Sequence, residues 1–174
     1  MPLTRIKSLG ITDGTIVNAD IDTAAAIATS KLGAGAVLQV VTATTLTSDT
    51  TTSSTYVDSS LSASITPSST SNKIYIVISS RGGVGVGDKA PRYAIFRDST
   101  NITGSSSTEG MSIYQANGAT IQSLSITYLD SPSTTSSITY KLRFRAQDGT
   151  SDTNYCNGAT GKNSITLMEI KAWL

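Results

Sequence analysis

Residues Ser137–Ala146 read SITYKLRFRA, and apolar and polar side chains alternate along almost all of this stretch. Successive side chains of a β-strand point to opposite faces. One face would therefore carry Ile138, Tyr140, Leu142 and Phe144, and the other would carry Thr139, Lys141, Arg143 and Arg145. The pattern predicts a strand that buries one face in a core and leaves the other face polar.

The same period of two recurs on both sides of this stretch, from residue 36 to the end of the chain. Clusters of Gly, Pro, Asn, Asp and Ser separate the alternating segments. Many short strands without helices are typical of sandwiches, so we predict an all-β fold, an antiparallel β-sandwich of jelly-roll type, over residues 36–174. The further predicted strands are Val37–Thr47, Thr55–Ile65, Lys73–Ser80, Arg92–Arg97, Met111–Gln115, Thr120–Leu129 and Ser164–Trp173.

Two of these segments depart from simple alternation. In Lys73–Ser80, Tyr75 and Val77 make the second face apolar as well. A strand that is apolar on both faces is either central or lies against a neighbouring subunit. In the last segment the phase changes between Leu167 and Met168, so we expect a β-bulge there.

Residues 1–35 follow another pattern, in which single aliphatic residues are separated by small, polar and turn-forming ones. The steps between the aliphatic residues are five or six, which places them on no single face of a helix or strand. We call this set the aliphatic ladder: Ile6, Ile11, Ile16, Ile21, Ile27 and Leu32.

The aliphatic ladder cannot hold an isolated chain in one conformation. Burying its side chains stabilises the segment less than ordering the backbone costs in conformational entropy. We therefore expect identical copies to meet around a symmetry axis, with each copy contributing one aliphatic side chain per layer. The alternative is a disordered tail whose isoleucine spacing arose by chance.

The end of this segment carries helix signals. Asp22 and Thr23 are candidate N-caps for a short helix over Ala24–Lys31, and Gly33 and Gly35 are candidate stop signals. We place the boundary here, with a stalk for attachment and trimerisation over residues 1–35 and a β-sandwich knob over residues 36–174.

Composition excludes several classes of function. Charged residues make up 14% of the chain and the net charge is +1, so no electrostatic case exists for nucleic acid or an anionic membrane. The chain has no His, and its one cysteine, Cys156, is expected to be a small buried side chain. The N-terminal residues lack the apolar core of a secretory signal, so we expect synthesis in a cytoplasm.

No motif predicts catalysis or a resident cofactor or metal. The glycine-rich stretch 81–87 resembles a phosphate loop but precedes no helix. The loop Asp148–Asn154 has oxygen ligands for Ca²⁺ but not the spacing of a calcium loop. No pair of carboxylates is suggested by spacing, so we expect the protein not to be an enzyme.

Four residues are candidates for contact with a surface. Lys141, Arg143 and Arg145 form a basic stripe, which either is solvated, pairs with acidic groups of a neighbouring subunit, or contacts acidic surface glycans. Tyr155 lies in a predicted loop of a composition suited to sugar binding.

Two parts of the sequence resemble a known group of proteins. The run ITDGTIVNADI followed by AIATSKL, within Ile11–Leu32, resembles the N-terminal segment of tail-fibre and other virion structural proteins of tailed bacteriophages, marine and cyanobacterial phages especially. Residues Thr52–Ile76 are similar in character to the distal domains of such fibres. The resemblance implies a homotrimeric virion appendage without chemistry of its own.

We therefore expect a short homotrimeric fibre of the virion, assembled in the host cytoplasm. Its stalk would anchor to tail, baseplate or capsid proteins, and its knob would contact the host surface through loops, with a surface glycan as the candidate partner. The alternative is a capsid decoration or head-fibre protein whose stalk inserts between capsid subunits. A depolymerase is less well supported, because such enzymes are generally built on long β-helices.

Overall fold

The computed structural model describes residues 21–22, 25, 31–104, 110–114, 116–147, 154–157 and 161–172. The chain divides into two units, Met1–Leu32 and Gly33–Leu174. Most of the aliphatic ladder and of the expected helix Ala24–Lys31 lies outside the described residues. The following description concerns the second unit.

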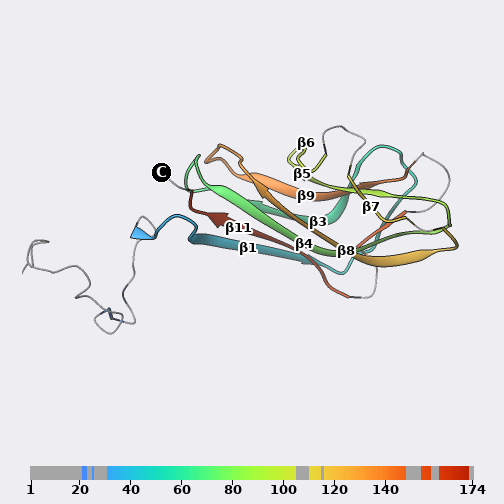
Figure 1. Cartoon of the computed structure of the whole chain (residues 1–174), viewed down its shortest axis with the longest axis horizontal. Helices are drawn as coiled ribbons and strands as arrows, with labels where there is room; N and C mark the ends of the chain where they lie inside the picture. Colours follow the sequence, from blue (N-terminus) through green and yellow to red (C-terminus); the bar gives the residue numbers. More distant parts are fainter. Residues whose placement is uncertain are drawn as a thin grey trace, which may run out of the picture. The chain divides into compact units, whose positions relative to one another are not determined.

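Two antiparallel sheets lie against each other in this unit (Figure 1). The predicted all-β fold and antiparallel β-sandwich are therefore confirmed. The six-stranded sheet contains β1 (Val37–Thr45), β2 (Asp49–Thr51), β4 (Lys73–Val84), β8 (Thr120–Asp130), β10 (Asn154–Cys156) and β11 (Asn163–Ile170). The five-stranded sheet contains β3 (Val57–Ile65), β5 (Arg92–Arg97), β6 (Thr100–Asn101), β7 (Met111–Ser112) and β9 (Ile138–Arg145).

Strand β4 organises the six-stranded sheet. On one side it pairs with β8 along all of its length except Lys73, from Ile74 opposite Asp130 to Val84 opposite Thr120. On the other side it pairs first with β11 and then with β10, and these strands pair in turn with β1 and β2. In the other sheet the order is β3–β9–β5–β6, and β7 also pairs with β5.

The prediction for the apolar face of β9 is confirmed, but on the other face Arg145 is buried. The four alternate apolar side chains of β9 are buried and join one core cluster with side chains from both sheets. The rings of Tyr93 and Phe144 stack in this core, with centroids 6.5 Å apart. The largest fully buried aliphatic side chains are Leu61, Ile74, Ile76, Ile78, Ile95, Leu142, Ile165 and Leu167.

The predicted β-bulge in the last strand is wrong. Strand β11 keeps an unbroken register with β4, and Leu167 and Met168 lie opposite Ile76 and Tyr75. Inward and outward side chains alternate throughout, but Glu169 takes an inward position that an apolar residue would usually fill. The buried carboxylate therefore produced the apparent change of phase.

Glu169 is stable in this position because donors surround it. Its Oε1 accepts hydrogen bonds from the Ser68 backbone N (2.7 Å), the Ser68 hydroxyl (2.8 Å) and the Asn72 side-chain amide (2.6 Å). Its Oε2 accepts one from the Gln39 side-chain amide (2.6 Å). Burial raises the pKa of Glu169, but these hydrogen bonds outweigh burial and hold the pKa below its ordinary value.

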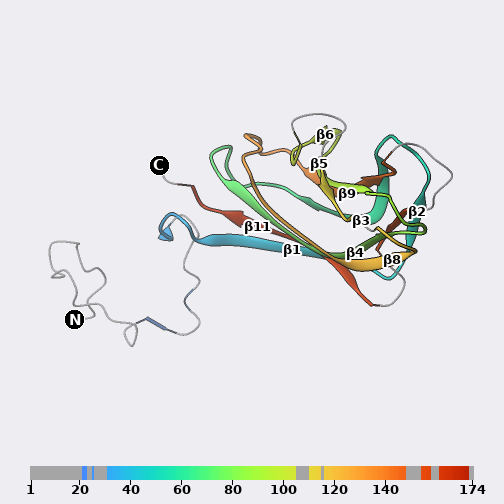
Figure 2. The ribbon, with the colours of Figure 1, turned by 45° about the vertical axis from the view of Figure 1, so that its right-hand side comes forward.

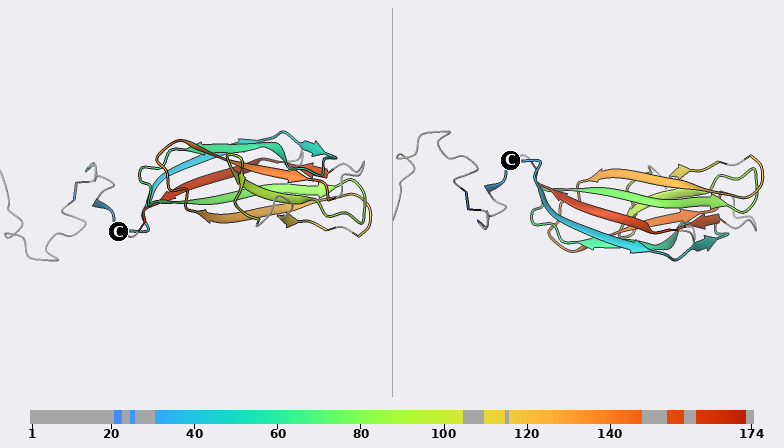
Figure 3. Two further views of the ribbon diagram at one scale, coloured as in Figure 1. Left: turned by 90° about the horizontal axis from the view of Figure 1, so that it is seen from above. Right: turned by 90° about the horizontal axis from the view of Figure 1, so that it is seen from below.

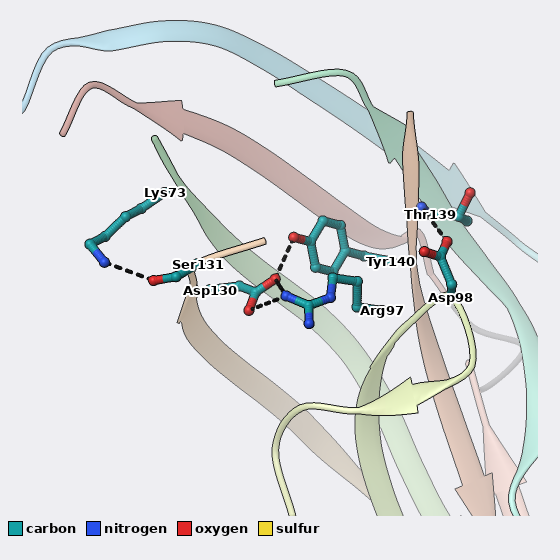
Figure 4. A network of polar contacts seen from close by, with 7 residues as sticks. All are labelled: Lys73, Arg97, Asp98, Asp130, Ser131, Thr139 and Tyr140. Atoms are coloured by element: carbon teal, nitrogen blue, oxygen red, sulfur yellow. Dashed lines mark hydrogen bonds and ion pairs between the residues drawn. The ribbon is translucent and has the colours of Figure 1, made fainter. Parts of the chain in front are cut away.

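A second buried carboxylate ties the two sheets together (Figure 4). Asp130 ends β8 in one sheet, whereas Arg97 and Tyr140 belong to the other. Its carboxylate accepts two hydrogen bonds from Arg97 Nη1 (2.9 and 3.0 Å) and one from the Tyr140 hydroxyl (2.7 Å). Burial, followed by the hydrogen bond to Asp130, raises the pKa of Tyr140.

Strand β4 is longer than the predicted segment Lys73–Ser80, because it continues through Gly82 and Gly83 to Val84. The Tyr93 hydroxyl accepts a hydrogen bond from the Gly83 backbone N (2.7 Å) and donates one to the Tyr155 carbonyl (2.7 Å). A Cβ on Gly83 would lie 2.8 Å from the Ile121 Cα and closer still to the Thr120 carbonyl oxygen. Here glycine allows β8 to approach β4 closely.

Replacing Gly83 with alanine is therefore expected to destabilise the knob. The added methyl would meet backbone atoms, which cannot rotate away as a side chain can, so we expect a loss of about 1–3 kcal/mol. Urea unfolding followed by circular dichroism would measure it. Gly33→Ala is the matched control, because a Cβ there meets nothing within 4 Å. Equal midpoints for the two variants would contradict the close approach.

The unit has two distinct ends (Figures 2 and 3). Its first strand begins where its last strand ends: Gly35 N donates to the Lys171 carbonyl (2.8 Å), and Lys171 N donates to the Ala36 carbonyl (2.9 Å). The connections from β4 to β5 and from β7 to β8 lie at the opposite end (Figure 3). The chain thus enters and leaves the sandwich at one end.

Candidate interaction surfaces

Ile21 and Leu32 are the two residues of the aliphatic ladder that the structure describes. Both side chains are exposed, with 41% and 36% of their surface accessible in the single chain. Ile6, Ile11, Ile16 and Ile27 lie outside the described residues. Their role in trimerisation stays a prediction.

The basic stripe lies on the outer face of the five-stranded sheet and is largely paired within the chain. Lys141 Nζ lies 2.7 Å from a carboxylate oxygen of Asp58, and the Arg143 guanidinium forms a second ion pair with the same carboxylate. Burial raises the pKa of Asp58, but Lys141 and Arg143 together hold it below its ordinary value. Arg143 also lies over the ring of Phe96, 4.5 Å from its centroid.

Arg145, the third member of the stripe, is buried. Its Nη1 donates to the carbonyl oxygens of Ser54 (3.3 Å), Ala146 (3.0 Å) and Gln147 (3.1 Å), so it fixes the backbone around the end of β9. Only Lys141 and Arg143 therefore reach the surface, beside an acidic partner. Contact of the stripe with an acidic glycan stays a prediction.

Tyr155 belongs to β10, in the sheet opposite the stripe, so the structure does not place these candidates on one face. The side chain is half-buried and lines a pocket of about 340 Å³. The other lining residues are Val84, Ala119, Thr120 and Ile121. This pocket has one aromatic ring among mostly apolar walls, which suits the apolar face of a small ligand.

The outer face of the six-stranded sheet carries a feature that our sequence analysis did not locate. Four apolar side chains lie directly opposite one another in register across four strands, and we call them the apolar row: Val40, Met168, Tyr75 and Leu129. Val40 and Leu129, on the two outer strands, expose 56% and 51% of their surface. The apolar second face of Lys73–Ser80 was the one signal for this row in the sequence.

Beyond the apolar row the next two sets of positions on the same face are progressively more polar, and a charged side chain follows them at Arg81. The next positions in register are Thr42, Thr166, Val77 and Thr127, and the following ones are Thr44, Ser164, Ser79 and Ser125. The hydroxyls of Thr42 and Thr166 are hydrogen-bonded at 3.1 Å. These uncharged positions contrast with the ion pairs around Asp58 on the other sheet.

A pocket of about 480 Å³ adjoins the apolar row at the end where the chain enters the sandwich. It shares Leu129 with the row and is otherwise lined by Gly35, Ser71, Lys73, Ile170, Lys171 and Ala172. Lys73, one of these lining residues, donates a hydrogen bond from Nζ to the Ser131 hydroxyl (2.7 Å), as Figure 4 shows.

The described side chains offer little for nucleophilic attack or for binding a metal. Cys156 is buried as predicted, and burial raises the pKa of its thiol to about 12. No group of acidic, His or Cys side chains that could hold a metal occurs within the part of the chain that the structure describes. The candidate Ca²⁺ ligands Asp148 and Asp152 lie outside it. Among the described residues, no helix is long and apolar enough to cross a membrane.

No model of a protein family matches the chain, and no curated protein matches it. The arguments for function therefore rest on the residues and on the geometry of the sandwich.

Proposed function

We propose that this protein is a short homotrimeric fibre of a bacteriophage virion, in which residues 1–35 anchor and trimerise the chain and residues 36–174 form a knob that contacts the host surface. One observation supports this proposal most. The aliphatic ladder, which needs companion chains, runs directly into a sandwich that the chain enters and leaves at one end. Such a knob can be held at that end and present the loops at the other.

We also propose that the knob is a jelly roll. The strand order supports this, because the longer strands alternate between the two sheets: β1 and β4 belong to one sheet, whereas β3 and β5 belong to the other. Later in the chain, β8 and β11 return to the first sheet and β9 to the second. The longer strands thus cross between sheets in sequence order, as they do in the two Greek keys of a jelly roll.

The proposed role is structural and adhesive, with no catalytic step. Contact with the host would be made by side chains at the end opposite the chain's entry, where Tyr155 lines a pocket with Val84 and Ile121. A neutral sugar could place its apolar face on the aromatic ring there. The role of a capsid decoration protein would use the same trimer at another position on the particle.

Replacing Ile11, Ile16 and Ile21 together with serine tests the proposal. We expect the wild-type chain to have about three times its mass of 18.1 kDa by light scattering. The triple variant should lose incorporation into virions, because each change removes an aliphatic layer from all three chains at once. Circular dichroism of the variant should retain the strand signal, because the sandwich has its own core.

Changing Thr12, Thr15 and Asn18 to serine provides a matched control, since these residues of the same segment lie between the aliphatic positions. The control should join virions normally. A wild-type chain that is monomeric at micromolar concentration would contradict the trimer. Normal incorporation of the triple isoleucine variant would show that the knob, and not residues 1–35, carries the attachment.

A further inference from the structure

The apolar row is continuous across the outer face of the sheet. Val40 lies opposite Met168, Met168 opposite Tyr75, and Tyr75 opposite Leu129, so strand pairing fixes all four on one face. Contiguous exposed apolar surface of this kind marks an interaction site in soluble proteins. The core of the sandwich does not use these residues, because the alternate residues of the same strands fill it.

We propose that this face, from the apolar row to the adjoining hydroxyl-bearing positions, is where copies of this chain pack against one another in the assembled protein. This inference rests on the proposed trimer. It adds which surface of the knob forms the contact between the copies. The knobs would then hold one another through their six-stranded sheets, and the five-stranded sheets with Asp58, Lys141 and Arg143 would face outward.

The position of the row along the chain favours another copy as the occupant. Val37 and Val40 begin the sandwich, and Leu32, the last residue of the aliphatic ladder, precedes Val37 by only five residues. If the ladder brings identical chains to one axis, their first strands must begin close to that axis. The apolar row lies at that end of β1, whereas the serine-bearing positions lie farther along the strand.

The lack of charge within the apolar row and the adjoining hydroxyl-bearing positions favours the same occupant, with Lys73 and Arg81 flanking these positions on β4. Copies related by symmetry bring the same residues near one another, so a charged side chain close to the axis would meet its own kind. None of the four residues of the apolar row is charged, and neither is any of the threonine and serine positions that follow. Hydroxyl groups both donate and accept hydrogen bonds and therefore suit contacts between identical surfaces.

Cysteine labelling of the full chain tests this proposal directly. Val40→Cys and Leu129→Cys place thiols on the row, and Ser62→Cys places one at an exposed position of β3 in the other sheet. The wild-type chain sets the background, because Cys156 is buried. Maleimide labelling of the purified protein under native conditions, with labelling in urea as reference, gives the accessibility of each position.

We expect labelling at positions 40 and 129 to be at least about tenfold slower than at position 62, because thiol reactivity follows exposure. Both positions are more than half exposed in the single chain. Slow labelling therefore requires that another part of the protein covers them. Light scattering on the same samples identifies the cover, since only copies of the chain are present. Slow labelling in a protein of three times the monomer mass supports the proposal.

Three outcomes would overturn it. Fast labelling at positions 40 and 129 in a trimer would show that the knobs do not meet through this face, while the proposed fibre would stand. Slow labelling in a monomer would show that residues 1–32 of the same chain cover the row. Fast labelling in a monomer would overturn both the interface and the proposed trimer.

Discussion

The variant Asp130→Ala is expected to lower the free energy of unfolding of the knob by about 2–4 kcal/mol. The Asp130 carboxylate accepts hydrogen bonds from the Arg97 guanidinium and from the buried Tyr140 hydroxyl. Its removal leaves both donors, which lie largely away from water, without this acceptor. We expect somewhat less than a fully buried pair would give, because the Arg97 side chain is 28% exposed and can reach water. Urea unfolding followed by circular dichroism would measure the change in the free energy of unfolding.

Asp58→Ala is the matched control for this prediction. Asp58 also has two basic partners, Lys141 and Arg143, but 45% of its side chain is exposed. Solvent screens such pairs, so its removal should cost no more than about 1 kcal/mol. Tyr140→Phe removes one hydrogen bond to Asp130 and should cost about 1 kcal/mol. If Asp130→Ala were no more destabilising than Asp58→Ala, the bridge between the sheets would not contribute as we describe.

The second large effect is expected at Glu169. Glu169→Ala leaves the Ser68 backbone N and the side-chain amides of Asn72 and Gln39 without their acceptor. Because unpaired buried donors are costly and a charged acceptor is lost, we expect a loss of about 2–4 kcal/mol. The turn between β3 and β4 should loosen as well, because Ser68 and Asn72 both belong to it. Hydrogen exchange at residues 66–72 would show this.

Glu169 should also make the stability of the knob depend on pH. Its pKa in the folded protein lies below its ordinary value. The stabilisation is therefore present above the ordinary value of about 4.3 and is lost as the pH falls below it toward the folded pKa. Glu169→Gln keeps the shape and one acceptor but cannot titrate, so it should lower stability at pH 7 and flatten the profile between pH 5 and 3. A wild-type profile no steeper than that of Glu169→Gln would contradict the assignment.

Local alternation determined much of this fold. The strands Arg92–Arg97 and Ile138–Arg145 are close to the predicted ones, because one apolar face along a short segment is a property of the segment itself. The antiparallel sandwich followed from the number of such segments and the lack of helices between them. Burial of Cys156 was likewise predictable from residue type.

Predictions from sequence alternation were wrong where a polar residue occupies an inward position or a small residue continues a paired strand. Glu169 looked like a break in the strand because its donors, Gln39 and Ser68, come from segments more than a hundred residues away. Gly82 and Gly83 lay beyond the predicted end of Lys73–Ser80, although they continue β4 where β8 approaches it closely. In each case the partner that makes the residue suitable is supplied only by the folded chain.

For the candidate interaction surfaces, too, some features were predictable from the sequence and others only from the folded chain. The sequence by itself determined that Lys141 and Arg143 share a strand face and that Lys73–Ser80 is apolar on both faces. Only the tertiary structure decided that Asp58 pairs with the basic side chains and that Val40, Tyr75 and Leu129 meet in one row. The physical reason is strand register: side-chain direction is set within each strand, whereas the neighbours across a sheet depend on which strands pair and at which residue.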